Sequence, residues 1–215
     1  MFVTAVAVAL LVTTGGILLA TGGFNVQRVT VVGASRSTTD RVSTLAKSDR
    51  GHLLLTVNTS TLRHRIAALS QVADVQVTRV WPHTLRIEVT ERRPIVAVHD
   101  GAQWLLVDKN ADAYLSVARP PASVLPLSVP GSSSDGQRLR AAVAVVGALP
   151  RAVRKDVIAV SAPSPAGIRL QLRGGSTVIW GGPDDSVRKA KALAVLVRRH
   201  AHVYDVSSPG IVTTS

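Results

Sequence analysis

The stretch from residue 72 to residue 98, VADVQVTRVWPHTLRIEVTERRPIVAV, constrains the fold of this chain more than any other. Apolar and polar residues alternate on both sides of residues 81–83, and the apolar positions are rich in valine and isoleucine. A period of two is typical of half-buried strands, so the stretch predicts a β-hairpin. A three-residue loop centred on Pro82 sets Val77 opposite Ile87. A slip of one residue would turn one apolar face to water, so the register is strongly specified.

The first 23 residues form the second constraint, because they carry no ionisable side chain. The segment from Phe2 to Gly23 is 22 residues long, and as a helix it spans about 33 Å, enough for a hydrocarbon core of about 30 Å. A secretory signal peptide is the alternative, but such a peptide has a basic leading region and a small-residue cleavage site. We therefore expect residues 1–23 to be a transmembrane anchor.

The charges around this anchor favour one orientation by themselves. No lysine or arginine precedes it, whereas four basic residues follow it before residue 50: Arg28, Arg36, Arg41 and Lys47. The positive-inside rule, taken alone, would place the rest of the chain in the cytoplasm.

Residues 24–94 predict a small α+β domain. A strand over 24–33 ends at Gly33, a helix begins at Thr39, and a second helix is capped by Asn58 or Ser60. The hairpin follows, and residues 91–94 form the seam to a second domain. The order is strand, helix, helix, strand, strand, which places two helices on one face of a three-stranded sheet.

Residues 95–215 predict a β-rich mixed domain with two helices. The first helix ends by Gly147, and the second runs from Asp184-Asp185-Ser186 to about His200, with Val187, Ala190, Ala194 and Val197 on its buried side. An extended connector with four prolines is expected over 120–131. Strands are expected over 95–98, 104–108, 157–160, 168–172, 177–180, 203–206 and 210–213.

The sequence offers little for catalysis. Cysteine is absent, and the chain has no nucleophile elbow, phosphate-binding loop, dinucleotide fingerprint or zinc-protease motif. Asp184 and Asp185 read as helix caps, and His200 and His202 have no third metal ligand nearby. We expect no catalytic residues, no cofactor and no metal, and therefore a protein that is not an enzyme.

The hairpin and its surroundings match a known family. The matching string is W-P-x-T-L-x-I-x-V-x-E-R-x-P, preceded by F-x-V-x-x-V-x-V-x-G after the anchor. The chain resembles the FtsQ/DivIB family of bacterial cell division proteins, which implies a POTRA domain over 24–94 and an FtsQ-type β domain over 95–215. It also implies that both domains lie outside the cytoplasmic membrane, at the division septum. The signature residues, read as structural, are Gly33, Arg79, Trp81, Pro82, Leu85, Glu91, Arg92 and Pro94.

The end of the chain is the predicted binding region. A terminal strand pair can leave a strand at a sheet edge, where its free N–H and C=O groups accept a partner strand. The resemblance implies that the last strands and the preceding helix bind FtsB- and FtsL-type division proteins. The expected partner-binding residues are Arg188, Lys191, Val203, Tyr204, Asp205, Val206, Gly210, Ile211, Val212 and Thr213.

Two other functions stay open on the residues alone. A POTRA module of a transport or outer-membrane assembly system would bind unfolded chains, but it would be followed by further POTRA units or a β-barrel. A binder of anionic cell-wall polymer would use the net charge of +12, which comes from 25 basic and 13 acidic residues, and would depend strongly on salt. Aromatic residues make up 3% of the chain, so no specific nucleic-acid binding is expected.

Overall fold

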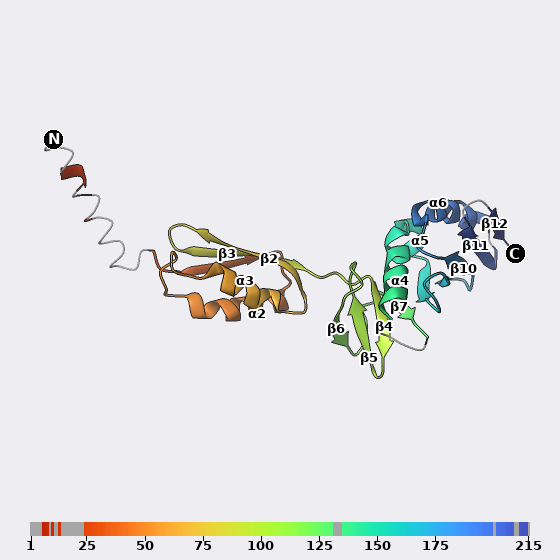
Figure 1. The fold of residues 1–215 in the computed structure, drawn as a ribbon, viewed down its shortest axis with the longest axis horizontal. Coiled ribbons are helices and arrows are strands. Elements are labelled where there is room, and N and C mark those ends of the chain that lie inside the picture. The colour runs from red at the N-terminus through yellow and green to blue at the C-terminus, as the bar shows by residue number, and fades with distance from the viewer. Residues whose placement is uncertain are drawn as a thin grey trace. The chain divides into compact units, whose positions relative to one another are not determined.

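The computed structural model describes residues 6–8, 10, 13, 24–130, 135–199, 201–208 and 211–214. The anchor predicted over 1–23 lies almost entirely outside these residues. Among the residues that are described, no helix is both long enough and apolar enough to cross a membrane. The chain divides into two compact units, residues 1–92 and residues 93–215 (Figure 1).

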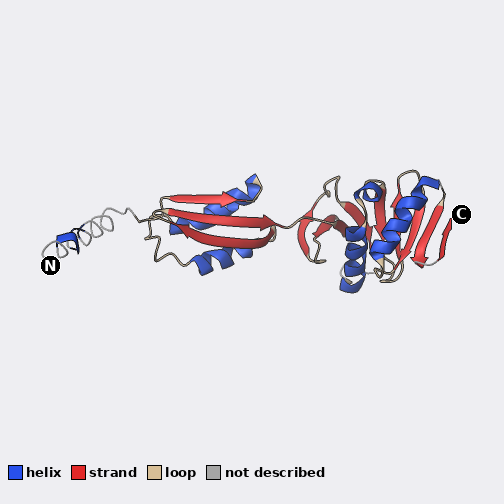
Figure 2. Ribbon diagram, turned by 90° about the horizontal axis from the view of Figure 1, so that it is seen from above, coloured by secondary structure: helices blue, strands red, loops and turns tan. Residues whose placement is uncertain are grey.

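The first unit is a three-stranded sheet with two helices on one face (Figure 2). Its elements are β1 (Arg28–Val32), α2 (Arg36–Ala46), the 3-10 helix η1 (Lys47–Asp49), α3 (Thr59–Ala67), β2 (Val72–Val80) and β3 (Thr84–Glu91). The sheet order is β1-β3-β2, with β1 parallel and β2 antiparallel to β3. The predicted element order is therefore confirmed. Helix α2 begins at Arg36, three residues before the predicted start, because the N–H of Thr39 already donates to the carbonyl of Ser35.

The hairpin of this unit has the predicted register. Val77 lies opposite Ile87, so both apolar faces point to the same side of the sheet.

The side chain of Asn58 accepts a hydrogen bond from the N–H of Thr61 at 3.0 Å and caps α3. The core is aliphatic, and its fully buried members include Val42, Leu54, Leu62, Ile66, Leu85 and Ile87.

The second unit is built on a nine-stranded mixed sheet. Its strands are β4 (Val96–Asp100), β5 (Gln103–Val107), β6 (Ala113–Val117), β7 (Leu125–Ser128), β8 (Val157–Ser161), β9 (Ile168–Leu172), β10 (Thr177–Gly181), β11 (Val203–Ser208) and β12 (Ile211–Thr214). The order across the sheet is β12-β11-β10-β9-β8-β7-β4-β5-β6. The helices are α4 (Gly136–Ala148), α5 (Arg151–Arg154) and α6 (Ser186–Leu196), followed by the 3-10 helix η2 (Val197–Arg199).

The expectation of two helices in this unit was wrong, because the short helix α5 was missed. Pro150 follows the end that the sequence predicts for the preceding helix, and no new helix is predicted to begin there. The carbonyl of Pro150 instead accepts from the N–H groups of Val153 and Arg154 at 3.0 and 2.9 Å. A proline just before a first turn lacks a donor that the helix would not have used, so it starts a helix as readily as it ends one.

The connector predicted over 120–131 was also partly wrong, because it contains strand β7. Prolines argue against a central strand, since each removes one donor from the ladder. β7 nevertheless lies between β4 and β8. Leu125 and Leu127 are buried in the main core of the unit, and their burial outweighs the missing donor.

Helix α6 buries most of the predicted face: Ala190 is buried, and Ala194 and Val197 are partly buried against the core. Val187 was expected inside, but its side chain is 67% exposed. The buried side is formed by Lys189, Ala190 and Leu193. Lys189 joins the buried side because its Nζ donates to two backbone carbonyls. The acidic cap was also wrong: Asp185 has a left-handed backbone at the helix start, and its side chain makes no capping hydrogen bond.

Candidate functional site

Strand β12 lies at one edge of the nine-stranded sheet. It pairs antiparallel with β11, which in turn pairs parallel with β10. Among the described residues β11 is its one neighbour in the sheet, so half of its backbone groups have no partner in the ladder.

The hydrogen bonds of β10 and β11 establish which way the backbone of β11 faces. Alternate residues of a strand direct their N–H and C=O groups to opposite neighbours. The N–H of Thr177 donates to the carbonyl of His202 at 2.9 Å, and Thr177 lies opposite Val203. In a parallel pair this places the backbone groups of His202 and Tyr204 toward β10. Those of Val203 and Asp205 therefore face β12.

The same alternation identifies the free groups of β12. Asp205 faces β12 and lies opposite Thr213, so the two residues form a hydrogen-bonded pair and Thr213 faces β11. Ile211 is two positions earlier and faces the same way. Val212 and Thr214 therefore direct their N–H and C=O groups to the open edge.

A bulge on β11 leaves this alternation on β12 intact. From Asp205 to Ser208 the chain takes three steps along β11, while β12 takes two between Thr213 and Ile211. The extra residue is therefore on β11. The carboxylate of Asp205 accepts from the N–H of Ser207 at 2.9 Å, which gives the bulge a local hydrogen bond.

Two side chains of β11 belong to the core. Tyr204 and Val206 are 3% and 1% exposed, so they position the strand and are not available to a partner. The hydroxyl of Tyr204 accepts from the N–H of Ala201 at 3.0 Å. Val203 and Asp205 are half-buried. Gly210, also predicted for this site, lies outside the described residues.

Helix α6, which packs against β11, presents a second surface. Arg188 and Lys191 are exposed as predicted, and Arg188 lies 3.9 Å from the carboxylate of Asp185. The sequence did not predict the apolar part of this surface. Val187 and Val195 are 67% and 63% exposed and share one face with Lys191, at spacings of four residues.

Lys189 is the residue that sequence reasoning missed. It is 4% exposed, and its Nζ donates to the carbonyls of Trp180 and Gly182 at 3.2 and 3.0 Å. The lysine thereby fastens the start of α6 to the end of β10. Its spacing of four residues from buried Leu193 was the available signal.

The signature residues of the first unit have structural contacts. The guanidinium of Arg79 donates to the carbonyls of Leu54 and Val57 at 3.0 and 2.7 Å. Arg92 donates from Nε to the carbonyl of Val72 at 3.2 Å. Gly33 has a φ of 83°, and a Cβ there would collide with the carbonyl oxygen of a neighbouring strand. These contacts join strand β2 to the loop before α3, the end of the unit to the start of β2, and the end of β1 to β3.

The hairpin turn combines an exposed and a packed side. The peptide bond from Trp81 to Pro82 is cis. The side chain of Trp81 is 54% exposed, and its ring meets that of Phe24 edge-on, with 6.0 Å between centroids. Leu85, just after the turn, is fully buried. Pro94 is half-buried at the start of the second unit.

Metal coordination has no candidate in the part of the chain that is described. There, no group of three or more histidine, aspartate or glutamate side chains is placed to hold an ion.

Comparisons with known proteins identify the relatives of this chain. The family model described as POTRA domain, FtsQ-type, matches residues 24–92. The cell division protein FtsQ of Streptomyces bingchenggensis is 36% identical over 220 residues, covering 97% of this chain and 83% of that protein. FtsQ of Streptomyces venezuelae is 34% identical over 220 residues, covering 94% and 81%. A solved structure, the major extracytoplasmic domain of the division protein DivIB from Geobacillus stearothermophilus, is 17% identical, with a TM-score of 0.38, covering 52% of this chain and 98% of that chain.

Proposed function

This chain belongs to the FtsQ family of bacterial cell division proteins, and we propose that it is a non-enzymatic, membrane-anchored scaffold of the division complex. In this proposal residues 1–23 anchor it in the cytoplasmic membrane, and both units lie outside that membrane at the septum. Its work is to recruit or regulate FtsB- and FtsL-type division proteins by pairing a strand of the partner with β12. The family membership supports a role in division, and the free sheet edge supports the mode of binding.

The open backbone of β12 is the observation that carries this proposal. Within the described part of the sheet, Val212 and Thr214 each offer an N–H and a C=O that no neighbouring strand uses. An added strand pairs with such groups through main-chain hydrogen bonds, whatever its side chains are. Because strand spacing is fixed at about 4.8 Å, the partner strand would lie beside β12 in the plane of the sheet.

Helix α6 gives the same partner a second contact. Its outer face combines the exposed Val187 and Val195 with the cations of Arg188 and Lys191. Such a face suits an amphipathic partner helix with acidic and aliphatic residues. A partner that supplies a helix followed by a strand would use both surfaces.

A single proline tests the strand pairing. Val212→Pro removes an N–H that points to the open edge and leaves the donors toward β11 in place. The expected result is loss of FtsB- and FtsL-type proteins from co-purifications out of membranes. Val212→Thr keeps the N–H and serves as the matched control, with partner recovery near that of the parent chain. Fluorescence of Trp180, which is fully buried, reports that the second unit stays folded.

Truncation before Val203 removes both β11 and β12 and extends the test. Unchanged partner recovery from this shortened chain, or from Val212→Pro, would refute the terminal-strand site. Loss with Val212→Thr as well as with Val212→Pro would show that the side chain rather than the backbone is recognised.

A further inference from the structure

A proline interrupts the middle of the nine-stranded sheet. Pro126 is in β7, between β4 and β8. The carbonyl of Ser128 accepts from the N–H of Ala162 at 2.9 Å, so Ser128 faces β8. Pro126 is two positions earlier and faces β8 as well. At that point the ladder needs a donor, and proline has none.

Strands β7 and β8 accordingly pair only at their later residues, and their first residues are not paired with each other. The pairing covers Leu127 with Val160 and Ser128 with Ser161. On β8, a register shift against β9 falls between Val157 and Ala159, which leaves Ile158 as an extra residue with 45% of its side chain exposed. The two strand starts therefore flank an opening instead of closing the sheet.

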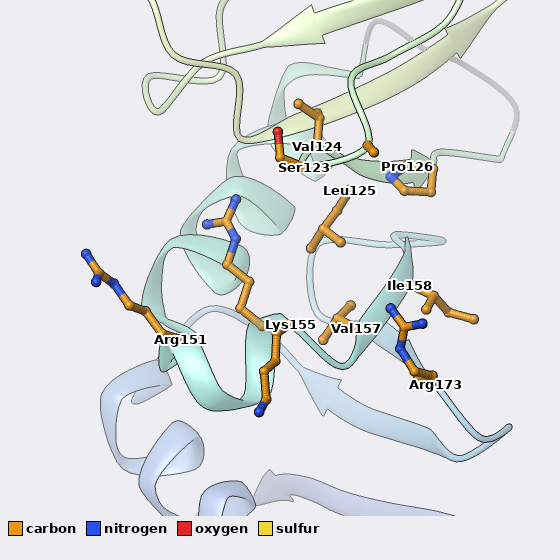
Figure 3. Close-up of a pocket in the computed structure, with 11 residues that line it drawn as sticks. Ser123, Val124, Leu125, Pro126, Arg151, Lys155, Val157, Ile158 and Arg173 are labelled. Atoms are coloured by element: carbon orange, nitrogen blue, oxygen red, sulfur yellow. The ribbon is translucent and has the colours of Figure 1, made fainter.

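A hollow of about 420 Å³ lies at this opening. It is lined by the loop before β7, the strand starts, helix α5 and the turn after β9. Figure 3 shows Leu125 and Val157 between the side chains of Arg151, in α5, and Lys155, just after it, on one side and that of Arg173 on the other. The floor of the hollow is thus aliphatic and its rim is basic.

The charge of the rim is not neutralised within the lining. Four of the eleven lining residues are cations, Arg154 being the fourth, and none is acidic. Within the described residues no ion pair is formed by Arg151, Lys155 or Arg173, and all three are exposed. Arg154 donates to the carbonyl of Ile95 at 3.4 Å, a neutral acceptor. Four like charges around one hollow raise its affinity for an anion.

We propose that this hollow binds an extended acidic peptide segment of a partner protein, with an aliphatic side chain seated on Ile158 and Leu125. Carboxylates of the peptide pair with the rim cations. Its backbone lies along the gap that Pro126 leaves between β7 and β8, where strand edges can hydrogen-bond a peptide. A polyol phosphate polymer shares the negative charge but has neither aliphatic side chains for the floor nor amides for the strand edges.

This site is independent of the one on β12. It uses β7, α5 and β8, near the middle of the sheet order, whereas β12 is at its end. The two sites would accept two different segments. A failure of one proposal therefore leaves the other standing.

The test measures the binding of four soluble probes to the whole chain in detergent. Binding is detected by fluorescence polarisation of a labelled probe, or by competition of an unlabelled probe against it. The probes are a blocked Asp-Leu-Glu-Leu-Asp peptide, its neutral Asn-Leu-Gln-Leu-Asn form, its Asp-Gly-Glu-Gly-Asp form, and poly(glycerol phosphate). The acidic leucine peptide is expected to bind most tightly. Replacing Arg151, Lys155 and Arg173 together by Ala is expected to weaken it by about tenfold, as three partly screened pairs would.

Three further variants identify the recognised features. Replacing Arg28, Arg119 and Arg169 by Ala removes the same charge from exposed positions outside the hollow, and is expected to leave binding within about twofold. Ile158→Ser is expected to abolish the preference for leucine over glycine in the peptide. Val212→Pro is expected to change nothing here.

Several results would overturn the proposal. One is equal weakening by the two triple replacements, which would show attraction by net charge alone. Another is tighter binding of poly(glycerol phosphate) than of the acidic leucine peptide, which would make the hollow a polymer site. The absence of binding by every probe, with the fold intact, would also contradict it.

Discussion

The carboxylate of Glu91 accepts two hydrogen bonds from Ser35, one from its backbone N–H at 3.0 Å and one from its hydroxyl at 2.7 Å. Glu91 ends β3 and Ser35 precedes α2, so the pair ties the last strand of the first unit to the start of its first helix. Burial acts to raise the pKa of Glu91, but hydrogen bonds from Thr38 and Ser35 outweigh it and hold the pKa below its ordinary range.

This pair predicts an acid-sensitive contribution to the stability of the first unit. Because the folded-state pKa of Glu91 is lowered, its contribution is fully present above the unfolded-state value of about 4.3 and is lost as the pH falls through the folded-state pKa. Glu91→Gln should flatten this part of the pH dependence, measured by urea unfolding between neutral and acidic pH. Glu88→Gln, which removes an exposed carboxylate paired with Arg86, is the control. Equal slopes for parent and Glu91→Gln would contradict the role of Glu91.

Gly33 is predicted to tolerate no side chain. Gly33 and Gly51 both have a φ of 83°, but a Cβ on Gly33 would collide with the Val89 carbonyl oxygen, while one on Gly51 would meet nothing within 4 Å. Gly51→Ala should therefore cost about 1 kcal/mol, the backbone strain alone. Gly33→Ala should cost roughly 2–4 kcal/mol, because the clash is added. Urea unfolding, monitored by amide hydrogen exchange in β3, measures the cost of each substitution. Equal costs for Gly33→Ala and Gly51→Ala would rule out the close approach of Gly33 to the Val89 carbonyl.

Arg79 is predicted to stabilise the first unit through its hydrogen bonds rather than its charge. Arg79→Met removes the two donors to the carbonyls of Leu54 and Val57, at an expected cost of about 1–2 kcal/mol. Arg86→Met removes the same charge from an exposed ion pair and should change the free energy of unfolding by about 0.5 kcal/mol or less. If Arg79→Met and Arg86→Met unfold at the same urea concentration, the hydrogen bonds of Arg79 make no net contribution to the stability of the first unit.

The buried Lys189 is predicted to be required for the junction between β10 and α6. Lys189→Met keeps the length of the side chain but leaves the carbonyls of Trp180 and Gly182 without their donor. The expected loss is about 1–3 kcal/mol, reported by the fluorescence of Trp180 during unfolding. Lys191 is two residues further on and exposed, so Lys191→Met should leave the free energy of unfolding nearly unchanged. A neutral Lys189→Met would show that the apolar stem alone holds the junction.

The sequence predicted the first unit well because its signals are local. Alternation fixed the pairing of Val77 with Ile87, and Asn58 capped its helix. The second unit was predicted less well where tertiary packing overrides local preference. β7 was read as a connector because of Pro126, and its place in the sheet depends on the burial of Leu125 and Leu127.

The candidate site divides in the same way. A terminal strand pair was visible in the sequence, and the structure places β12 at the sheet edge. On α6 the sequence did not predict the burial of Lys189, because that burial depends on the carbonyls of Trp180 and Gly182, which lie outside the helix. The direction of each backbone group on β12 needs the pairing with β11 and β10, which no sequence pattern contains.

Amide hydrogen exchange in β12 is the most direct test of the scaffold proposal. The chain is compared alone and in complex with a co-purified protein of the proposed FtsB type. The N–H of Thr213, which faces β11, should be protected in both states, while those of Val212 and Thr214 should become protected only in the complex. Unchanged exchange at Val212 and Thr214 while the partner stays bound would contradict pairing at this edge.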